Sequence, residues 1–369
     1  MSGGVPVKRL ISLLCVFLLL LGCGRQQDIS SQDYTPALSA SSLPVDPSAP
    51  SFHGIYGNGN VQAGVVYGSQ ESPDTYYRLL LQDGTVSAQP FGSSQELSQS
   101  LVLGLDGEDG FWIQGNDTQG RTVARRLDLE GNCLQTIDFG PGLAQAALSG
   151  FSYDQDNYYF LVTGRECSWL MIFDHSGTER FRRSLSDYST DTTGYLPREA
   201  DWMEELEGRK GDRLMEMIFP DGPANTFGLF RTPEGRVNMI IRRQSPIDSE
   251  TYGILCTLES DWSKAVPRYY YEIVTANSIQ PNTFLESTDP AYDLLVATTQ
   301  GIEGIRIATG RQTLLLTWKD ALDYPCANFY EATPSVSRCS CAGPDGTWWL
   351  YGWNGATESF DITVLTPEF

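Results

Sequence analysis

Residues 109–139 read DGFWIQGNDTQGRTVARRLDLEGNCLQTIDF. Turn-forming Asp-Gly and Glu-Gly pairs separate short runs of β-branched, aromatic and other apolar residues, and such runs predict β-strands. Residues 157–182, NYYFLVTGRECSWLMIFDHSGTERFR, repeat the same order of strands and turns 46 or 47 residues later. One turn glycine recurs at Gly84, Gly131 and Gly177, in steps of 47 and 46. A period near 46 with about four strands per unit is typical of β-propeller blades, which bury their apolar faces only against neighbouring blades.

The number of blades follows from the length of the repeating region. Residues 53–369 comprise 317 residues, close to seven periods of 46, whereas only six units can be identified. We therefore predict an all-β propeller of six to seven four-stranded blades. Residues 186–226 interrupt the repeat as an insertion or a degenerate blade, and their apolar spacing predicts a helix around 198–217. To close the ring, we expect residues 52–56 to complete the last blade beside the final strand at 362–365.

The N-terminus predicts export and lipidation. A basic pair precedes an apolar run over residues 10–21, which is the order of a secretory signal peptide covering residues 1–22. That run is too short to cross a bilayer core of ~30 Å, which takes about 20 helical residues. The residues LLGC that end at Cys23 resemble a bacterial lipobox, in which the cysteine is acylated. An ordinary signal peptide with a chance cysteine is the alternative. We predict a lipid-anchored protein on the extracellular side of the cell membrane.

Composition restricts the classes of function. The chain has 25 Lys+Arg and 46 Asp+Glu, a net charge of −21, so nucleic-acid binding has no electrostatic basis. His53 and His175 are the only histidines, which excludes a metal centre built from several of them. Neither a nucleophile elbow nor a nucleotide-binding glycine loop occurs in the sequence. Residues 23–52, rich in Ser, Gln, Pro, Ala and Asp, predict a flexible linker after the anchor.

No cofactor is predicted to be required, and calcium is the one cation with candidate ligands. Asp106, Glu108 and Asp109 lie in one predicted turn, and Asp154 and Asp156 lie in another. Carboxylate oxygens clustered in turns suit calcium. Neither turn follows the EF-hand pattern, and hairpin turns favour Asp, Asn and Gly for their own geometry. Calcium and plain turn chemistry therefore both stay open.

Aromatic residues near the C-terminus supply the candidate ligand-binding residues. In the predicted strand over 348–353, alternation places Trp349, Tyr351 and Trp353 on one face. Packing between blades is one interpretation of these side chains. The other is an aromatic platform for a sugar or a peptide at the mouth of the ring. We assign no catalytic residue.

One stretch resembles a known family. Residues 292–318 run from YDLLV to TLLLTW and resemble the propeller-like region of lipid-anchored proteins of Gram-positive bacteria. The residues DGTWW at 345–349 and ITVLT at 362–366 fit the same pattern. In some of these proteins a solute-binding domain of an ABC transporter follows the propeller, so the resemblance implies a role beside a transporter. This sequence ends at Phe369, where that domain would begin, and we do not expect this chain alone to be a transport receptor.

These observations predict a surface-anchored lipoprotein whose propeller is a non-enzymatic binding or interaction module for a protein, peptide or glycan. The alternative is a propeller hydrolase or lyase that acts on extracellular glycans with carboxylates at the central channel. A third hypothesis is a structural accessory of an envelope assembly without a small ligand. An enzyme should place carboxyl groups with perturbed pKa values at the channel, whereas a binder should show an aromatic or apolar mouth.

Overall fold

Short strands joined by tight turns account for nearly all of the described chain. They belong to the compact unit that starts at Ala37. Within the described residues there are 24 strands, a short α-helix and one 3-10 turn. The computed structural model describes residues 37–69, 72–143, 146–164, 168–191, 226–244, 251–273, 284–285, 287, 291–297, 301–307, 311–317, 340–343, 346–354 and 359–368.

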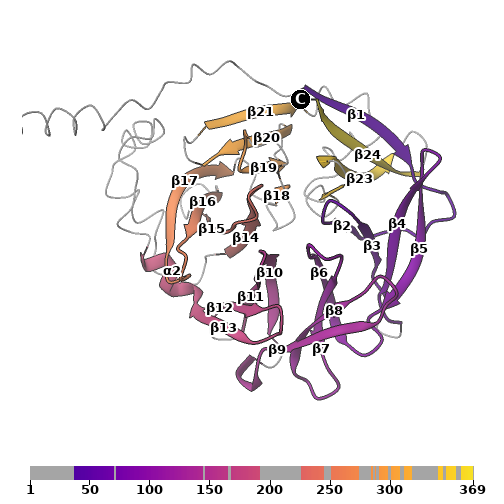
Figure 1. The fold of residues 1–369 in the computed structure, drawn as a ribbon. Helices are drawn as coiled ribbons and strands as arrows, with labels where there is room; N and C mark the ends of the chain where they lie inside the picture. Colours follow the sequence, from indigo (N-terminus) through magenta and orange to yellow (C-terminus); the bar gives the residue numbers. More distant parts are fainter. Residues whose placement is uncertain are drawn as a thin grey trace, which may run out of the picture. The chain divides into compact units, whose positions relative to one another are not determined.

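The strands form six antiparallel sheets of four, arranged as the blades of a ring (Figure 1). The predicted all-β propeller is therefore confirmed, with six blades in the described part of the chain. Blades 1 to 3 consist of β2 (Gly54–Gly57), β3 (Gln62–Val66), β4 (Thr75–Gln82) and β5 (Thr85–Ser93); β6 (Ser98–Leu105), β7 (Phe111–Asn116), β8 (Thr122–Leu127) and β9 (Cys133–Asp138); and β10 (Ala147–Tyr153), β11 (Asn157–Thr163), β12 (Ser168–Asp174) and β13 (Glu179–Ser184).

The remaining three blades follow in the same direction around the ring. Blade 6 differs from the others because its outer strand comes from the beginning of the folded chain. Blades 4 to 6 consist of β14 (Thr226–Arg231), β15 (Val237–Gln244), β16 (Thr251–Leu258) and β17 (Ala265–Ile273); β18 (Phe284–Leu285), β19 (Leu294–Ala297), β20 (Gly301–Arg306) and β21 (Arg311–Thr317); and β22 (Ser340–Ala342), β23 (Trp348–Asn354), β24 (Ser359–Glu368) and β1 (Ala37–Pro44).

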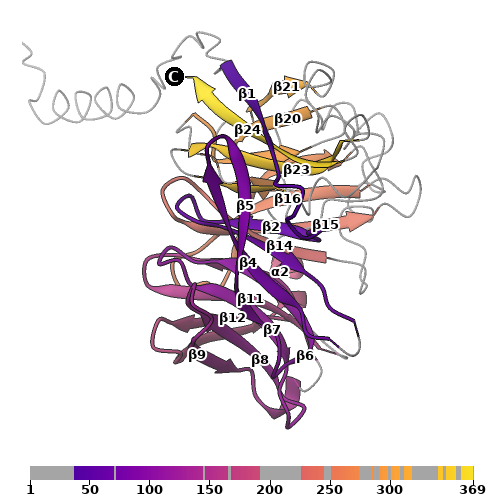
Figure 2. The ribbon, with the colours of Figure 1, turned by 90° about the vertical axis from the view of Figure 1, so that its right-hand side faces the viewer.

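The closure of the ring differs from the sequence prediction. β1 pairs antiparallel with β24 from Ala37↔Glu368 to Pro44↔Asp361, and the two strands lie side by side in Figure 2. Residues 52–56 do not close the ring, because they lead into and form β2, the first strand of blade 1. The boundary at residue 53 is corrected as well, since the folded chain already includes residues 37–44 of the predicted linker.

The composition of β1 explains why it was missed. It reads ALSASSLP, and Ser41, Ser42 and Pro44 are exposed. Of the β1 residues with described side chains, Leu43 alone packs against a core cluster, and it does so partly buried. An outer strand is held mainly by its backbone hydrogen bonds, so it needs no apolar alternation. Sequence periodicity therefore carries no signal for this strand.

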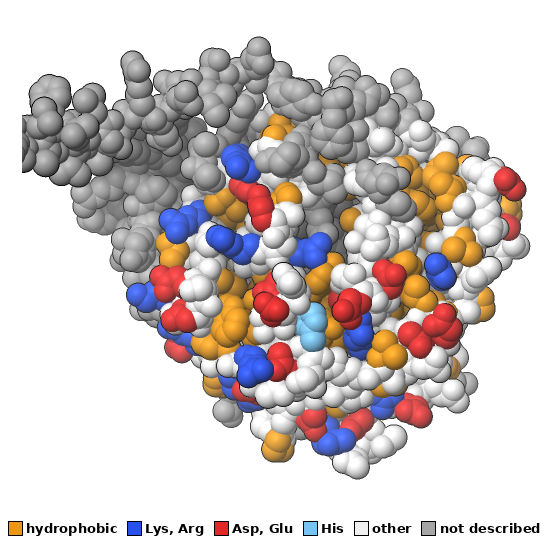
Figure 3. All heavy atoms as spheres, viewed as in Figure 1, with side chains coloured by type: hydrophobic (Ala, Val, Ile, Leu, Met, Phe, Trp, Pro, Cys, Tyr) orange, Lys and Arg blue, Asp and Glu red, His pale blue; other side chains and the backbone are white. Residues whose placement is uncertain are grey.

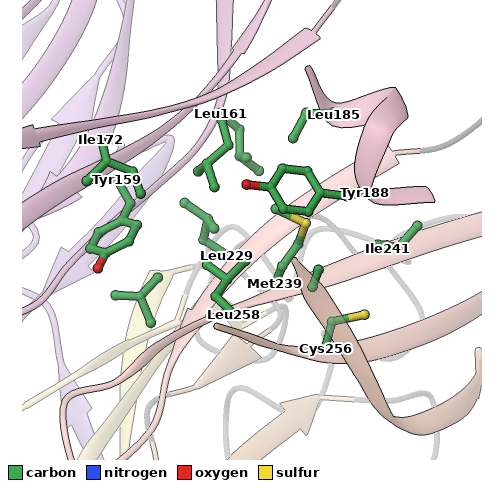
Figure 4. Packing of buried hydrophobic residues seen from close by; sticks show 13 residues of the cluster. Tyr159, Leu161, Ile172, Leu185, Tyr188, Leu229, Met239, Ile241, Cys256 and Leu258 are labelled. Atoms are coloured by element: carbon green, nitrogen blue, oxygen red, sulfur yellow. The ribbon is translucent and has the colours of Figure 1, made fainter. Parts of the chain in front are cut away.

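The core lies between neighbouring blades. From β7, Phe111 and Ile113 pack in the cluster between blades 1 and 2, whereas Trp112 packs in the cluster between blades 2 and 3. A third cluster joins blades 3 and 4 and includes Met239 and Tyr188 (Figure 4). Blades 1 to 4 are covered on both faces by such clusters, so each of them depends on its neighbours for a core.

One described helix sits beside blade 3. It is α2 (Leu185–Asp191), and its Tyr188 is fully buried in the cluster of Figure 4. The helix predicted around 198–217, like all of residues 192–225, lies outside the described residues. In the part of the chain that the structure describes, no helix has the length and apolar character needed to span a membrane.

Candidate functional site

One end of the ring carries the connection between the first and second strands of each blade and, in blades 1 to 5, the connection between the third and fourth strands. Strands of a blade run alternately up and down, so the turn between the first and second strands and the turn between the third and fourth lie at the same end. We term this end the turn face. β24 is the third strand of blade 6, so it runs toward the turn face. In Figure 2 its arrowhead points to the left, and this is the side that faces the viewer in Figures 1 and 3. Figure 3 therefore shows the turn face, with acidic and basic side chains around the middle of the ring.

Several turns on this face are built around an aspartate that binds its own backbone. In the β8–β9 turn, Asp128 Oδ1 accepts hydrogen bonds from the backbone N–H groups of Glu130 and Asn132 at 3.0 and 2.7 Å. Asp174 makes the same two bonds in the β12–β13 turn. Gly131 has a φ of +89°, a left-handed conformation that glycine adopts without steric cost. Asp and Gly spaced three residues apart are thus local turn chemistry.

The β6–β7 turn extends this pattern into a buried cluster around Asp106. Asp106 Oδ1 accepts hydrogen bonds from the backbone N–H groups of Glu108 and Gly110, both at 2.9 Å. Its Oδ2 accepts from Trp112 Nε1 at 2.8 Å and from Arg126 Nε at 2.6 Å. A second guanidinium nitrogen of Arg126 lies 3.1 Å from Asp106 Oδ1. A carboxylate has about four lone-pair sites, so these donors saturate it.

The electrostatics of the cluster favour its charged forms. Burial alone would raise the pKa of Asp106, but hydrogen bonds from Arg126 and Trp112 outweigh it and hold that pKa below its usual range. Burial also opposes the charge of Arg126, whose pKa is nevertheless raised by its bonds to Asp106. Burial and the charge of Asp106 raise the pKa of Tyr158 to about 12. His175 stacks on Tyr158 at 4.5 Å between ring centroids. None of the shifts produces a group that exchanges protons near neutral pH.

Blade 3 repeats the arrangement with a tyrosine in place of tryptophan. Tyr159 Oη donates to Asp154 Oδ2 at 2.5 Å and accepts from Trp262 Nε1 at 3.1 Å. Burial, then the hydrogen bond to Asp154, raises the pKa of Tyr159 above its usual range. Trp262 belongs to the β16–β17 turn of blade 4, and its backbone oxygen accepts from Tyr188 Oη at 2.5 Å. These contacts lock blade 3 to blade 4.

Trp262 holds this position at a conformational cost. Its φ is +59°, which is rare for a large residue, and Gly177 has the equivalent place in blade 3 with a φ of +87°. Both residues donate a backbone N–H to the carbonyl three residues earlier in a third-to-fourth-strand turn. The ring of Trp262 is partly buried and lies 5.8 Å from the ring of Phe181. A strained backbone that persists needs compensating contacts, and the contacts of this indole supply them.

Polar groups also surround the centre of the ring at the turn face. Asn58, after the first strand of blade 1, donates to the backbone oxygen of Asp106 at 2.5 Å and to Asp109 Oδ1 at 2.8 Å. At the ends of β10 and β14, the guanidinium of Arg231 lies 4.2 Å from the ring centroid of Tyr153. The ends of the first strands of blades 1, 3 and 4 therefore carry paired polar and aromatic groups at the turn face.

The structure separates the predicted calcium ligands by role. The carboxylates of Asp106 and Asp154 are engaged with their own turns and with aromatic donors, and Asp109 binds Asn58. Glu108 and Asp156 are exposed. Across the described ranges, no three acidic, histidine or cysteine side chains gather as a metal site would require. Calcium binding stays a prediction, and the contacts explain these aspartates without it.

The predicted aromatic platform is placed in the core. Trp349 and Tyr351 are 3% and 2% exposed and belong to the cluster between blades 6 and 1, together with Phe52 and Ile362. The side chain of Trp353 lies outside the described residues. The two described side chains follow the packing interpretation, because a platform needs an exposed ring face.

The sequence analysis did not identify Arg126 and Trp262, although the sequence pattern around each residue could have indicated it. Arg126 alternates with Ala124 in β8 and so shares its buried face, where a charge requires a partner. Trp262 occupies a hairpin position that holds glycine in blades 2 and 3. A missing glycine in a repeated turn therefore marks a side chain retained for its contacts.

The fold defines a six-bladed β-propeller. No protein-family model matches the chain, and no curated protein matches it. Similar solved structures include the WD40 domain of SCAP from fission yeast (8% identity, 90% of this chain and 74% of that chain, TM-score 0.34) and the WD40 domain of coronin from Toxoplasma gondii (8%, 90% and 87%, 0.43). Another is alpha-L-arabinanase from Penicillium chrysogenum complexed with arabinobiose (9%, 88% and 97%, 0.44).

Proposed function

We propose that this protein is a lipid-anchored, non-enzymatic binding module that recognises a protein, peptide or glycan outside the membrane. One electrostatic observation carries the non-enzymatic part. Among the residues that the structure describes, every carboxyl group with a shifted pKa has it shifted downward. These carboxylates accept N–H or O–H hydrogen bonds, which stabilise the charged form.

A carboxylate-based glycan hydrolase needs the opposite arrangement. One of its two carboxyl groups must keep a proton near neutral pH, which requires burial without donors and a raised pKa. Asp106 is the deeply buried carboxylate of the cluster, and its donors hold it ionised. For the cluster around Asp106, the observation therefore favours binding over acid catalysis.

Trp262 supplies the surface that best supports ligand recognition. Its indole is partly exposed on the turn face, and its N–H is fixed by Tyr159. Phe181 lies beside it, and exposed Asp261 precedes it in the chain. A rigid aromatic group with polar neighbours recognises a sugar ring or a peptide side chain at low entropic cost. We infer that ligand contact centres on this turn instead of on Trp349.

Thermal unfolding of the soluble Cys23→Ser chain tests recognition. Oligosaccharide and peptide panels are scanned, because a ligand at 100 times its Kd stabilises the fold by ~2.7 kcal/mol. One ligand class should raise the Tm, and Trp262→Ala should abolish that shift relative to its own baseline. Leu134→Ala, at an exposed leucine of blade 2, is the matched control and should keep the shift. Cleavage of any glycan in the panel would overturn the non-enzymatic proposal.

The anchor has its own test. Full-length protein made in a bacterial host should float with membranes and carry acyl chains on Cys23, as detected by mass spectrometry. Cys23→Ser should release it into the soluble fraction. Membrane association that persists in Cys23→Ser would contradict lipidation as the mode of attachment.

A further inference from the structure

The charged groups near Trp262 differ in how they are paired. Arg180 and Arg182, on either side of Phe181, each have a carboxylate partner, at 2.6 and 2.7 Å. Within the described chain, by contrast, four carboxylates in the two turns next to the indole have no ion pair with Lys or Arg. They are Asp154, Asp156, Glu259 and Asp261.

The first two of these carboxylates belong to the β10–β11 turn, which a tyrosine ties to the indole. Tyr159 Oη donates to Asp154 Oδ2 and accepts from Trp262 Nε1 at 3.1 Å. Asp156 is exposed in the same turn as Asp154. Burial and Asp154 raise the pKa of Tyr159, and the charge of Asp156 adds to this rise. Both carboxylates are therefore close enough to act on the linking hydroxyl.

The other two carboxylates belong to the turn of Trp262 itself, β16–β17. Trp262 donates its backbone N–H to the carbonyl oxygen of Glu259 at 2.9 Å, and Asp261 directly precedes it. Glu259 and Asp261 are exposed. Lys264, exposed in the same turn, interacts with the charge of Asp261 and offsets one of the four negative charges. The surroundings of the indole thus keep a net negative charge.

We propose that the Trp262 turn docks a Lys or Arg side chain from a basic peptide segment of a partner protein. This inference rests on the proposed function and specifies the chemistry of its ligand. A cation over an aromatic ring is attracted by the ring quadrupole, most strongly over tryptophan. Trp262 is partly exposed, and the ring of Phe181 lies 5.8 Å away. Aromatic surface next to unpaired negative charge complements a cationic head on an apolar stem.

Hydrogen bonding within the two turns favours a cation over a sugar. Asp154 Oδ1 accepts from the backbone N–H groups of Asp156 and Asn157, both at 2.8 Å. Asp261 Oδ1 accepts from the N–H and the hydroxyl of Ser263 at 3.0 and 2.7 Å. Sugar hydroxyls need acceptor lone pairs that are not already in use, whereas a cation responds to the charge of a carboxylate as a whole. The net charge of −21 also attracts basic partners.

NMR of the indole N–H groups tests the ligand class on the ¹⁵N-labelled Cys23→Ser chain. Trp262→Phe identifies the Trp262 resonance by its disappearance. The probes are acetyl-Gly-Lys-Gly-amide, its Arg analogue, its neutral Gln analogue, and chitotriose. The Lys and Arg peptides should shift this resonance saturably, with a Kd at least about fivefold lower than that of the Gln peptide. Calorimetry of the same peptides measures this preference without a substitution in the site.

Charge substitutions test the carboxylates while the indole stays in place. Asp156→Asn combined with Asp261→Asn keeps the accepting oxygens and removes two charges. This double variant should bind the Lys peptide at least about threefold more weakly at low salt. Glu130→Gln, at an exposed turn position of blade 2, is the matched control and should keep the affinity. An unchanged affinity in the double variant would contradict the contribution of these charges.

The outcomes separate this inference from the proposed function. Equal affinities for the Lys and Gln peptides, or tighter binding of chitotriose, would overturn the cationic ligand and leave recognition at Trp262 in place. A Trp262 resonance that no probe shifts would overturn both the cationic ligand and the assignment of Trp262 as the contact residue. A preference for the charged peptides that salt does not weaken would also contradict the inference, because exposed charges are screened.

Discussion

Blades 2 and 6 have a tryptophan at the same position, but the hydrogen bonding of its indole N–H differs. Trp112 and Trp349 are each the second residue of the second strand of their blade, and each packs toward the next blade. In blade 2 the indole N–H binds the carboxylate of Asp106. In blade 6, Gly343 stands at the place of Asp106, since both open the turn with the same backbone bond. Trp349 Nε1 is buried and has no hydrogen-bond partner among the described residues.

The partner on the third strand changes together with the turn residue. Arg126 pairs across from Trp112, whereas Val364 pairs across from Trp349. Next to this tryptophan, blade 2 thus has the ion pair of Arg126 with Asp106, whereas blade 6 has the apolar Val364. Replacing a buried ion pair by apolar groups is often neutral, whereas removing one partner is costly. The carboxylate of Asp106 therefore stabilises blade 2, whereas blade 6 forms with Gly343 at the equivalent position.

The largest effect is expected when Asp106 alone is removed. Asp106→Ala leaves the Trp112 N–H without its acceptor and leaves the half-buried Arg126 with only the exposed Glu108 as an ion-pair partner, which should cost about 3 kcal/mol of unfolding free energy. Urea unfolding measures this loss. Asp128→Ala is the matched control at a half-exposed turn position and should cost only about 1 kcal/mol. Equal losses in both variants would remove the distinction between the buried and the half-exposed aspartate.

The two tryptophans should respond differently to the same substitution. Trp112→Phe and Trp349→Phe shrink the ring equally, but only the first breaks a hydrogen bond to a charged group. Trp112→Phe should therefore cost about 1.5–3 kcal/mol more than Trp349→Phe. Denaturant midpoints at constant m-value report the difference. Equal costs would mean that Trp349 Nε1 has an acceptor after all.

Gly343 tests the packing of blade 6. A Cβ at this position would lie 2.3 Å from Trp349 Nε1, so the indole would have to move. Gly343→Ala should destabilise the protein by about 1–3 kcal/mol. Gly142→Ala has no neighbour within 4 Å of the added carbon and should be close to neutral. A neutral Gly343→Ala would show that the indole can shift at no cost.

The smallest expected effect is on the pH dependence of stability. The pKa of Asp106 is lowered from 3.8 in the folded state, so its contribution is present above that value and is lost as pH falls through the folded pKa. Asp106→Asn lacks this titration. Its unfolding free energy should therefore fall less steeply than that of the wild type below pH 4. Parallel pH profiles would contradict the lowered pKa.

The sequence predicted those features of the fold that local chemistry repeats in every blade. Gly84, Gly131 and Gly177 all lie in third-to-fourth-strand turns with positive φ, as their spacing indicated. β1 was missed because its pairing with β24 joins distant parts of the chain through backbone bonds. Asp106 was noticed as a carboxylate, but its role depends on Arg126 two strands away. Short-range patterns thus reveal turns and strands, whereas acceptors and closing strands depend on contacts between distant residues.

A double-mutant cycle between Asp106 and Trp112 tests the structural role of the turn carboxylate most directly. Asp106→Ala, Trp112→Phe and the double variant are compared with the wild type by urea unfolding. The contact at 2.8 Å predicts a coupling energy above about 1 kcal/mol, because Trp112→Phe loses less once the acceptor is gone. Additive losses within about 0.3 kcal/mol would contradict the role assigned to this carboxylate.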